Sequence, residues 1–134
     1  MVAALTTLSV LLSAPGNVEP PAVAGYASAY APTVFEGVVA HRFDNGWWRV
    51  EPPADWYTVA GYAAVTDCGR VGEVVELRPV GAETWQRVLV ADCVGDVASL
   101  DWMLANNIVA ELDARLYARW AADYGTPLAL EMRP

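Results

Sequence analysis

Two Asp-Cys dipeptides are the residues in this 134-residue sequence whose types and spacing suggest chemistry. Asp67-Cys68 and Asp92-Cys93 each follow an apolar run and precede a loop that contains glycine. Each run is typical of a strand, so each strand would end on a carboxylate and a thiol. Two carboxylates about 5–10 Å apart suit glycosidic-bond cleavage by a retaining or an inverting route. Alternatively, both aspartates are ordinary turn residues at strand ends.

Composition excludes several other kinds of site. All eight cationic side chains are Arg, so lysine Schiff-base and phosphate-loop chemistry is impossible. One His and two Cys cannot supply a two-histidine or four-cysteine metal motif. The net charge of −8 disfavours nucleic acid as a partner. We therefore expect no metal and no cofactor.

The N-terminal 21 residues differ from the rest of the chain. Residues 2–14 are mostly apolar but too short to span a bilayer, and they resemble the core of an export signal without its basic start. Residues 14–21 contain three prolines and a glycine, which is typical of a linker. We expect an export segment and linker over 1–21, a domain over 22–134, and a secreted or cell-envelope location. The alternative is an N-terminal strand or helix that packs on the domain.

Short strands dominate the predicted elements of the domain. Apolar and aromatic patterns predict strands over residues 25–31, 61–66, 73–79, 85–92, 107–112 and 128–132. Helical spacing predicts a short helix over 33–41, a helical turn over 99–106, and a helix capped by Asp113. Asp44-Asn45-Gly46 predicts a turn from which residues 47–50 emerge. The pattern favours a mainly β fold, a six-stranded closed barrel with short decorating helices.

Four segments carry a family resemblance over about 100 residues. They are GYAS (25–28), GEVVEL (72–77), VLVADCVG (88–95) and IVAELDAR (108–115). In the same order they are similar to the ASWYG, LPLGTRVRV, VVRINDRGP or AADTGG, and IIDLSRAAA motifs of double-psi β-barrel domains. This group includes rare lipoprotein A-like glycan cleavers, the three-aspartate domain of lytic transglycosylases, and barwin- and expansin-like proteins. The chain lacks the group's AAH histidine, and Glu111 stands where the last motif has Asp.

The resemblance implies a double-psi barrel in which Asp92 is the general acid/base. Apolar neighbours would raise its pKa by desolvating the charged form. The alternative is an Asp92 that caps a loop through backbone N–H groups. Asp67 would be a catalytic helper or a structural turn residue. Glu111, inside an apolar run, would be a partnered buried carboxylate or simply face outward.

The cysteines Cys68 and Cys93 are expected to pair, because they end neighbouring strands at equivalent positions. Such a disulfide would contribute about 3.5 kcal/mol by restricting the unfolded chain, and disulfides fit exported proteins. The alternative is a catalytic thiol, for which His41 is the single imidazole partner in the chain.

Aromatic and cationic residues supply the predicted binding groups. Tyr26, Tyr30, Trp47 and Trp48 could form platforms on which sugar rings stack. The same side chains could instead cover the open end of the barrel. Arg70 could hold a substrate carboxylate or pair with a local acid.

These predictions combine into one functional hypothesis. We expect a monomeric exported protein that binds polysaccharide and cleaves peptidoglycan by a lytic-transglycosylase-like or glycosidase-like mechanism. The alternative is a non-catalytic polysaccharide-binding module similar to expansins or barwins. A third possibility is a structural or interaction domain.

Overall fold

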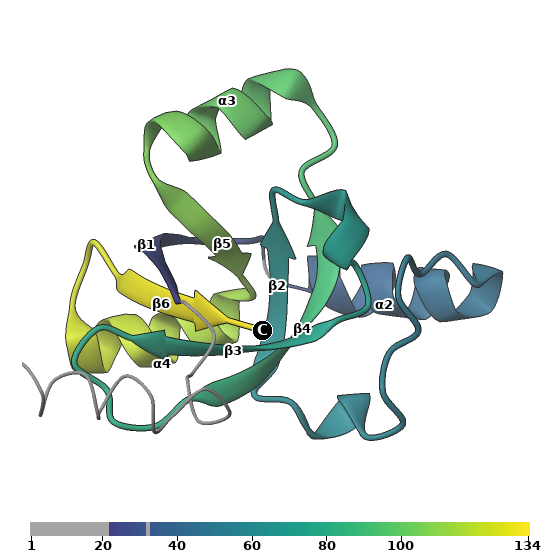
Figure 1. Ribbon diagram of the computed structural model, residues 1–134, viewed down its shortest axis with the longest axis horizontal. Helices are drawn as coiled ribbons and strands as arrows, with labels where there is room; N and C mark the ends of the chain where they lie inside the picture. The colour runs from purple at the N-terminus through teal and green to yellow at the C-terminus, as the bar shows by residue number, and fades with distance from the viewer. Residues whose placement is uncertain (1–21, 32) are drawn as a thin grey trace, which may run out of the picture.

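Six strands close into one barrel in the computed structural model, which describes residues 22–31 and 33–134 (Figure 1). They are β1 (Val23–Ala29), β2 (Gly61–Val65), β3 (Val74–Pro79), β4 (Gln86–Cys93), β5 (Ile108–Leu112) and β6 (Ala129–Arg133). The predicted mainly β fold with a closed six-stranded barrel is confirmed. The predicted export segment and linker over 1–21 lie outside the described residues.

The barrel is mixed, with the strand order β1-β5-β2-β4-β3-β6. The pairs β1·β5 and β2·β4 are parallel, and the other neighbouring pairs are antiparallel. Replacing β1, β2 and β3 by β4, β5 and β6 reproduces the same pairings. The strand pairings therefore have a two-fold pseudo-symmetry, but this symmetry relates β4 to β1 rather than to β2. The Asp-Cys repeat has another origin: β2 and β4 are parallel neighbours, so both end at one edge of the barrel.

The barrel interior is filled by alternate residues of the strands. In β3, for example, Val75 and Leu77 are fully buried, whereas Glu76 between them is not. Helix α4 (Ala114–Tyr124) packs against β1 and β2 and adds Leu116 and Trp120 to this core. Figure 1 shows α4 lying across one end of the barrel.

Helix α2 (Val34–Asn45) packs on the outside of the barrel, against β4. Its buried residues Phe35 and Val39 contact a second apolar cluster that includes Ala64, Leu89 and Ala91. This helix, coloured blue in Figure 1, extends away from the strands at its C-terminal end. It separates the outer surface of β4 from solvent along part of its length.

The predicted end of this helix at residue 41 and the predicted turn at 44–46 are wrong. The helix continues to Asn45, and Gly46 ends it in the left-handed region at φ 66° with its N–H donating to the Arg42 carbonyl. Residues 47–50 form no strand. An Asn-Gly pair suits a hairpin turn and a helix C-terminus equally well, and here it serves the second purpose.

Two aspartates begin the remaining helices. Asp96 accepts the Ser99 N–H at 2.6 Å and starts α3 (Val97–Ala105), a full helix where the sequence predicts one turn. Asp113 accepts the Leu116 N–H at 2.9 Å and starts α4, so the predicted cap is confirmed. Within the described ranges, no helix has the length and apolar character that crossing a membrane requires.

The segment after Trp47 is tied to the barrel by backbone hydrogen bonds. The N–H groups of Arg49 and Val50 donate to the Val71 carbonyl at 3.1 and 2.9 Å. Gly72 allows this close approach, because a Cβ there would collide with the Val50 carbonyl oxygen. Gly72 also has φ +111°, which side chains rarely adopt. The position of Trp47 is thus fixed from both sides, by α2 and by this tie.

Candidate functional site

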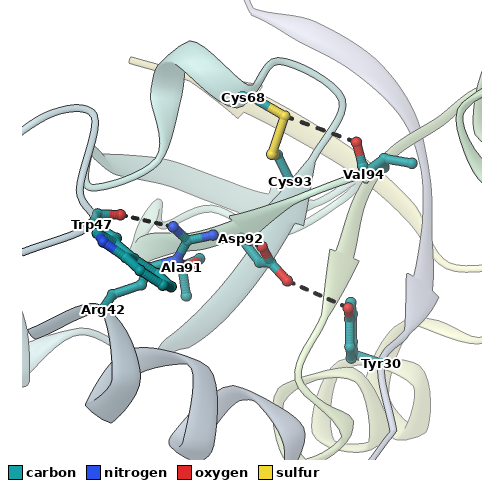
Figure 2. Close-up of polar contacts among 8 residues, drawn as sticks. All are labelled: Tyr30, Arg42, Trp47, Cys68, Ala91, Asp92, Cys93 and Val94. Atoms are coloured by element: carbon teal, nitrogen blue, oxygen red, sulfur yellow. Dashed lines mark hydrogen bonds and ion pairs between the residues drawn. A yellow bond between two sulfur atoms is a disulfide. The ribbon is translucent and has the colours of Figure 1, made fainter. Parts of the chain in front are cut away.

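A disulfide joins Cys68 to Cys93, with the sulfur atoms 2.05 Å apart (Figure 2). It links the short 3₁₀ helix η2 (Cys68–Arg70) after β2 to the last residue of β4. The predicted pairing is confirmed, and the alternative of a catalytic thiol is excluded for this oxidised form. The bridge locks together the two strand ends that carry the aspartates.

A β-bulge turns Asp92 to the outer face of the barrel. In the β2·β4 ladder Ala63 pairs with Val90 and Ala64 pairs with Asp92, so Ala91 is an extra residue. Val90 lies in the barrel core, while Ala91 packs in the cluster beneath α2. Strict alternation would have returned Asp92 to the interior. The bulge instead directs its carboxylate toward α2 and solvent.

Arg42, from α2, holds Asp92 and the backbone around it. Its Nη2 lies 2.8 Å from Asp92 Oδ1, its Nε donates to the Ala91 carbonyl at 2.7 Å, and its Nη1 donates to the Trp47 carbonyl at 2.8 Å. Figure 2 shows this guanidinium between Trp47 and Asp92. Arg42 thus gives the Asp92 carboxylate a charge-assisted hydrogen bond and fixes its position.

Tyr30 approaches Asp92 from the opposite side of the carboxylate. Its hydroxyl donates a long hydrogen bond to Asp92 Oδ2, at 3.5 Å (Figure 2), and its ring packs 4.6 Å from that of Phe35. Burial raises the pKa of Tyr30 above 10.0, as do the charges of Asp92 and Glu111 and the hydrogen bond to Asp92. Tyr30 is therefore a neutral hydrogen-bond donor in this site.

Glu111 is the second carboxylate near Tyr30. Across the sheet, Glu111 pairs with Ser28 on one side and with Ala64 on the other, and Ala64 pairs in turn with Asp92. Directly paired residues share a face, so all four side chains lie on the outer face. With strands about 4.8 Å apart, the Cα atoms of Glu111 and Asp92 are about 10 Å apart. Ala64, which lies between them, is buried in the apolar cluster beneath α2.

The environment of Glu111 raises the pKa of its carboxyl group. Burial raises its pKa above 4.5, the neighbouring Ser28 hydroxyl acts in the opposite direction, and the charge of Asp92 raises the pKa further. The two sequence-based alternatives for Glu111, outward-facing or partnered and buried, are thus each correct in part. It faces outward from the barrel, yet it is half-buried and interacts with Asp92.

Two predicted polar site residues have local partners. The Gly69 N–H donates to Asp67 Oδ1 at 2.9 Å, which makes Asp67 the cap of η2. This favours the structural alternative for Asp67, and its role as a catalytic helper stays a prediction. Arg70 Nε lies 3.4 Å from Glu73 Oε2, so Arg70 pairs with a local acid.

The four predicted aromatic groups have different environments. Trp47 is 59 % exposed and its ring packs edge-on against His41 at 4.9 Å. Tyr30 lies at the carboxylates, as described above. Trp48 packs against both apolar clusters, which agrees with the alternative that it covers part of the barrel rather than binding a sugar. Tyr26 is 40 % exposed on β1, where it pairs with Ile108.

A groove of about 590 Å³ runs along α2 beside Asp92. Its lining consists of Val34, Gly37, Val38, His41, Arg42, Trp47 and Asp92. The groove therefore brings one predicted catalytic residue, Asp92, and one predicted platform, Trp47, to a common surface. No cluster of three metal-ligating side chains occurs among the residues that the structure describes.

Arg42 is the functional residue that sequence reasoning missed. A signal exists: Phe35, Val39 and Arg42 are spaced four and three apart, so they share one helical face. An arginine on the buried face of a helix requires an acceptor, and Asp92 supplies it. No protein-family model matches this chain, and no curated protein or solved structure is significantly similar to it.

Proposed function

We propose that this protein cleaves glycosidic bonds, with Glu111 as the general acid and Asp92 as the charged partner carboxylate. One observation carries the proposal: two carboxylates share the outer face of the barrel in contrasting environments, one paired with a guanidinium and the other half-buried. The Arg42 guanidinium pairs with Asp92, whereas burial and the charge of Asp92 raise the pKa of Glu111. Such a difference between two neighbouring acids is the general requirement for acid and base roles at one site.

The proposed reaction conserves atoms and protons. Glu111 gives its proton to the glycosidic oxygen as the bond from that oxygen to the anomeric carbon breaks. Asp92 takes a proton from the attacking hydroxyl, which is water or the C6 hydroxyl of the sugar itself, as the oxygen of that hydroxyl bonds to the anomeric carbon. Arg42 occupies Oδ1 of Asp92, so Oδ2, beside Tyr30, is the oxygen that accepts this proton. Proton exchange with solvent restores both carboxylates.

The separation of the carboxylates is compatible with both classes of glycosidase. Inverting glycosidases keep their carboxyl groups about 6.5–9.5 Å apart, and retaining ones about 5–5.5 Å. Strand spacing puts the Cα atoms of Glu111 and Asp92 about 10 Å apart, a backbone separation from which the side chains can reach either range. The family resemblance gives the acid role to Asp92, but its ion pair with Arg42 favours Glu111 for that role.

The substrate that we propose for the first assay is peptidoglycan. The resemblance to double-psi β-barrel proteins that act on cell walls supports this choice, and so does the two-fold connectivity of the barrel. The disulfide fits a protein that works in an oxidising compartment outside the cytoplasm. The exposed Trp47 beside Asp92 provides an aromatic surface for a sugar ring.

The proposal is tested by digesting insoluble peptidoglycan with the purified, oxidised chain. We expect soluble fragments carrying new reducing or anhydro ends, detected by mass spectrometry. Glu111→Gln and Asp92→Asn should each lower the initial rate at least 100-fold, the usual size of a general acid or base contribution. Glu83→Gln and Asp101→Asn are matched controls at exposed positions and should keep the wild-type rate.

A non-catalytic polysaccharide-binding module is the second candidate. The open groove beside an exposed tryptophan favours it, since binding alone requires no acid. In the same digestion, this candidate predicts that the chain sediments with the glycan and releases no fragments. If the wild-type protein releases no fragments with new reducing or anhydro ends, glycosidic cleavage is excluded. The polysaccharide-binding module then remains.

A further inference from the structure

The groove along α2 has the volume of a small-ligand pocket. Resting on the proposed function, we propose that it is a subsite for a single uncharged pyranose, with Trp47 as its wall and Gly37 as its floor.

One face of α2 is directed to the groove rather than to the barrel. Val34, Gly37, Val38 and His41 follow the spacing i, i+3, i+4 and i+7, and all line the groove. The buried residues Phe35 and Val39 lie on a different face. The helix thus packs on the barrel with one stripe and presents a second, mostly apolar stripe to an open space. Its volume, about 590 Å³, is within the range of ligand pockets.

Gly37 is unexplained by packing. A Cβ built there would meet no atom within 4 Å, and the residue has an ordinary helical backbone. A glycine inside a helix is unfavourable compared with alanine, because it increases the backbone entropy of the unfolded chain. Neither close contact nor backbone strain requires it here. What the absent side chain does provide is a low floor in the middle of the groove.

Trp47 is held at a fixed distance from Asp92. The same guanidinium of Arg42 bonds to the Trp47 carbonyl and to the Asp92 carboxylate, both at 2.8 Å. The indole is also oriented by His41, whose ring meets it at 80°. An aromatic face of this kind packs against the C–H face of a pyranose. Arg42 therefore ties the backbone of the proposed wall to the partner carboxylate.

The charges in the groove favour an uncharged ring. Arg42 is the sole arginine among the described residues that line it, and its guanidinium is already bonded to Asp92 and to two carbonyls. His41 packs against Trp47 and contacts Asn45 rather than a carboxylate. Because the chain carries a net charge of −8, a uronate or a phosphorylated sugar would meet repulsion without a free cation to offset it.

Isothermal titration calorimetry of the Glu111→Gln variant tests the subsite without consuming the ligand. The probes are chitotetraose, which is uncharged, and tetragalacturonate, which is anionic. We expect chitotetraose to bind at least 10-fold more tightly than tetragalacturonate. Adding Gly37→Phe should weaken chitotetraose binding at least 10-fold, whereas Ala40→Phe, the matched control at an exposed position of α2 that does not line the groove, should change it less than 2-fold. Trp47→Ala, at an exposed position, should also weaken it at least 10-fold.

The outcomes separate this inference from the proposed function. Folded Gly37→Phe and Trp47→Ala variants that bind chitotetraose as tightly as their parent would overturn the subsite, even if peptidoglycan cleavage is observed. Equal affinity for tetragalacturonate would overturn the assignment to uncharged sugars. Groove-dependent binding of chitotetraose without any peptidoglycan cleavage would support the subsite and contradict the proposed enzyme. Circular dichroism and thermal melting establish that each variant is folded.

Discussion

Arg42 and Asp92 form an ion pair with 2.8 Å between Nη2 and Oδ1, and it connects the outer helix α2 to the bulged strand β4. Each side chain is about one-fifth exposed, so solvent screens the pair only in part. The pair joins the carboxylate that the bulge turns outward to the helix that covers it. Structure and proposed chemistry therefore depend on the same contact.

Replacing Arg42 should affect both stability and cleavage. Arg42→Met leaves Asp92 and two carbonyls without their donor, and we expect the free energy of unfolding to fall by about 1–3 kcal/mol. Arg42→Lys should recover part of the loss, because an ammonium can pair with Asp92 but cannot donate to three acceptors in a planar fork. Urea denaturation and the peptidoglycan assay measure the two effects.

The matched control for this experiment is Arg87→Met. Arg87 pairs with Asp55 at 3.1 Å, but these side chains are 40 % and 58 % exposed. Exposed pairs contribute about 0–1 kcal/mol, so the control should lose much less stability and retain activity. Equal losses for the two variants would argue against a special role for Arg42.

Glu111 should make stability depend on pH. Its pKa is raised in the folded state, by burial first and also by Asp92, so the folded chain binds a proton more tightly there than the unfolded chain does. The stabilising contribution of this proton is complete below pH 4.5, the ordinary pKa of the group. This contribution is lost as the pH rises through the raised pKa. Glu111→Gln should therefore stabilise the protein at pH 7, and the difference should shrink toward pH 4.

Thermal melting of wild type and Glu111→Gln between pH 4 and pH 8 checks the direction of this stability difference. The exposed Glu83→Gln variant should melt in parallel with wild type across the range. If Glu111 is the proton donor, the rate of cleavage should also decline as the pH rises through its pKa. A Glu111→Gln variant that is less stable than wild type at pH 7 would contradict the assignment of a desolvated carboxyl.

The disulfide should stabilise the fold through the unfolded state. Cys68 and Cys93 are 25 residues apart, and loop-closure entropy for such a separation amounts to about 3.5 kcal/mol. We expect reduction, or replacement of both cysteines by serine, to lower the free energy of unfolding by about that amount. Denaturation with and without a reductant measures it, and the double serine variant should not respond to the reductant.

The strands and the disulfide were predictable because their signals are local. The runs before Cys68 and Cys93 contain apolar residues at successive positions, which indicates strands covered on both sides. Two such strands in one small barrel bring their ends together when they are parallel neighbours. The pairing of the two cysteines follows from that arrangement.

The orientation of the carboxylates was not predictable in the same way. The bulge at Ala91 carries no glycine or proline, so no residue type signals that Asp92 leaves the alternation of the strand. Glu111 meets Asp92 because β2 alone lies between β5 and β4, and this strand order is a property of the whole barrel. The acid role could not be assigned to Glu111 before this neighbourhood was known.

Gly72→Ala should destabilise the protein much more than Gly81→Ala. Both have positive φ, +111° and +98°, so alanine is strained at either position. A Cβ at Gly81 would meet open space, and we expect a loss of about 1 kcal/mol from the backbone alone. At Gly72 the Cβ would also collide with the Val50 carbonyl oxygen, so the tie that fixes the segment after Trp47 must shift. Gly72→Ala should therefore lose more than about 2 kcal/mol in urea denaturation.

Gly72→Ala should also weaken chitotetraose binding, which Gly81→Ala should leave unchanged. Equal stability of the two variants would show that Val50 is not held against Gly72 in solution.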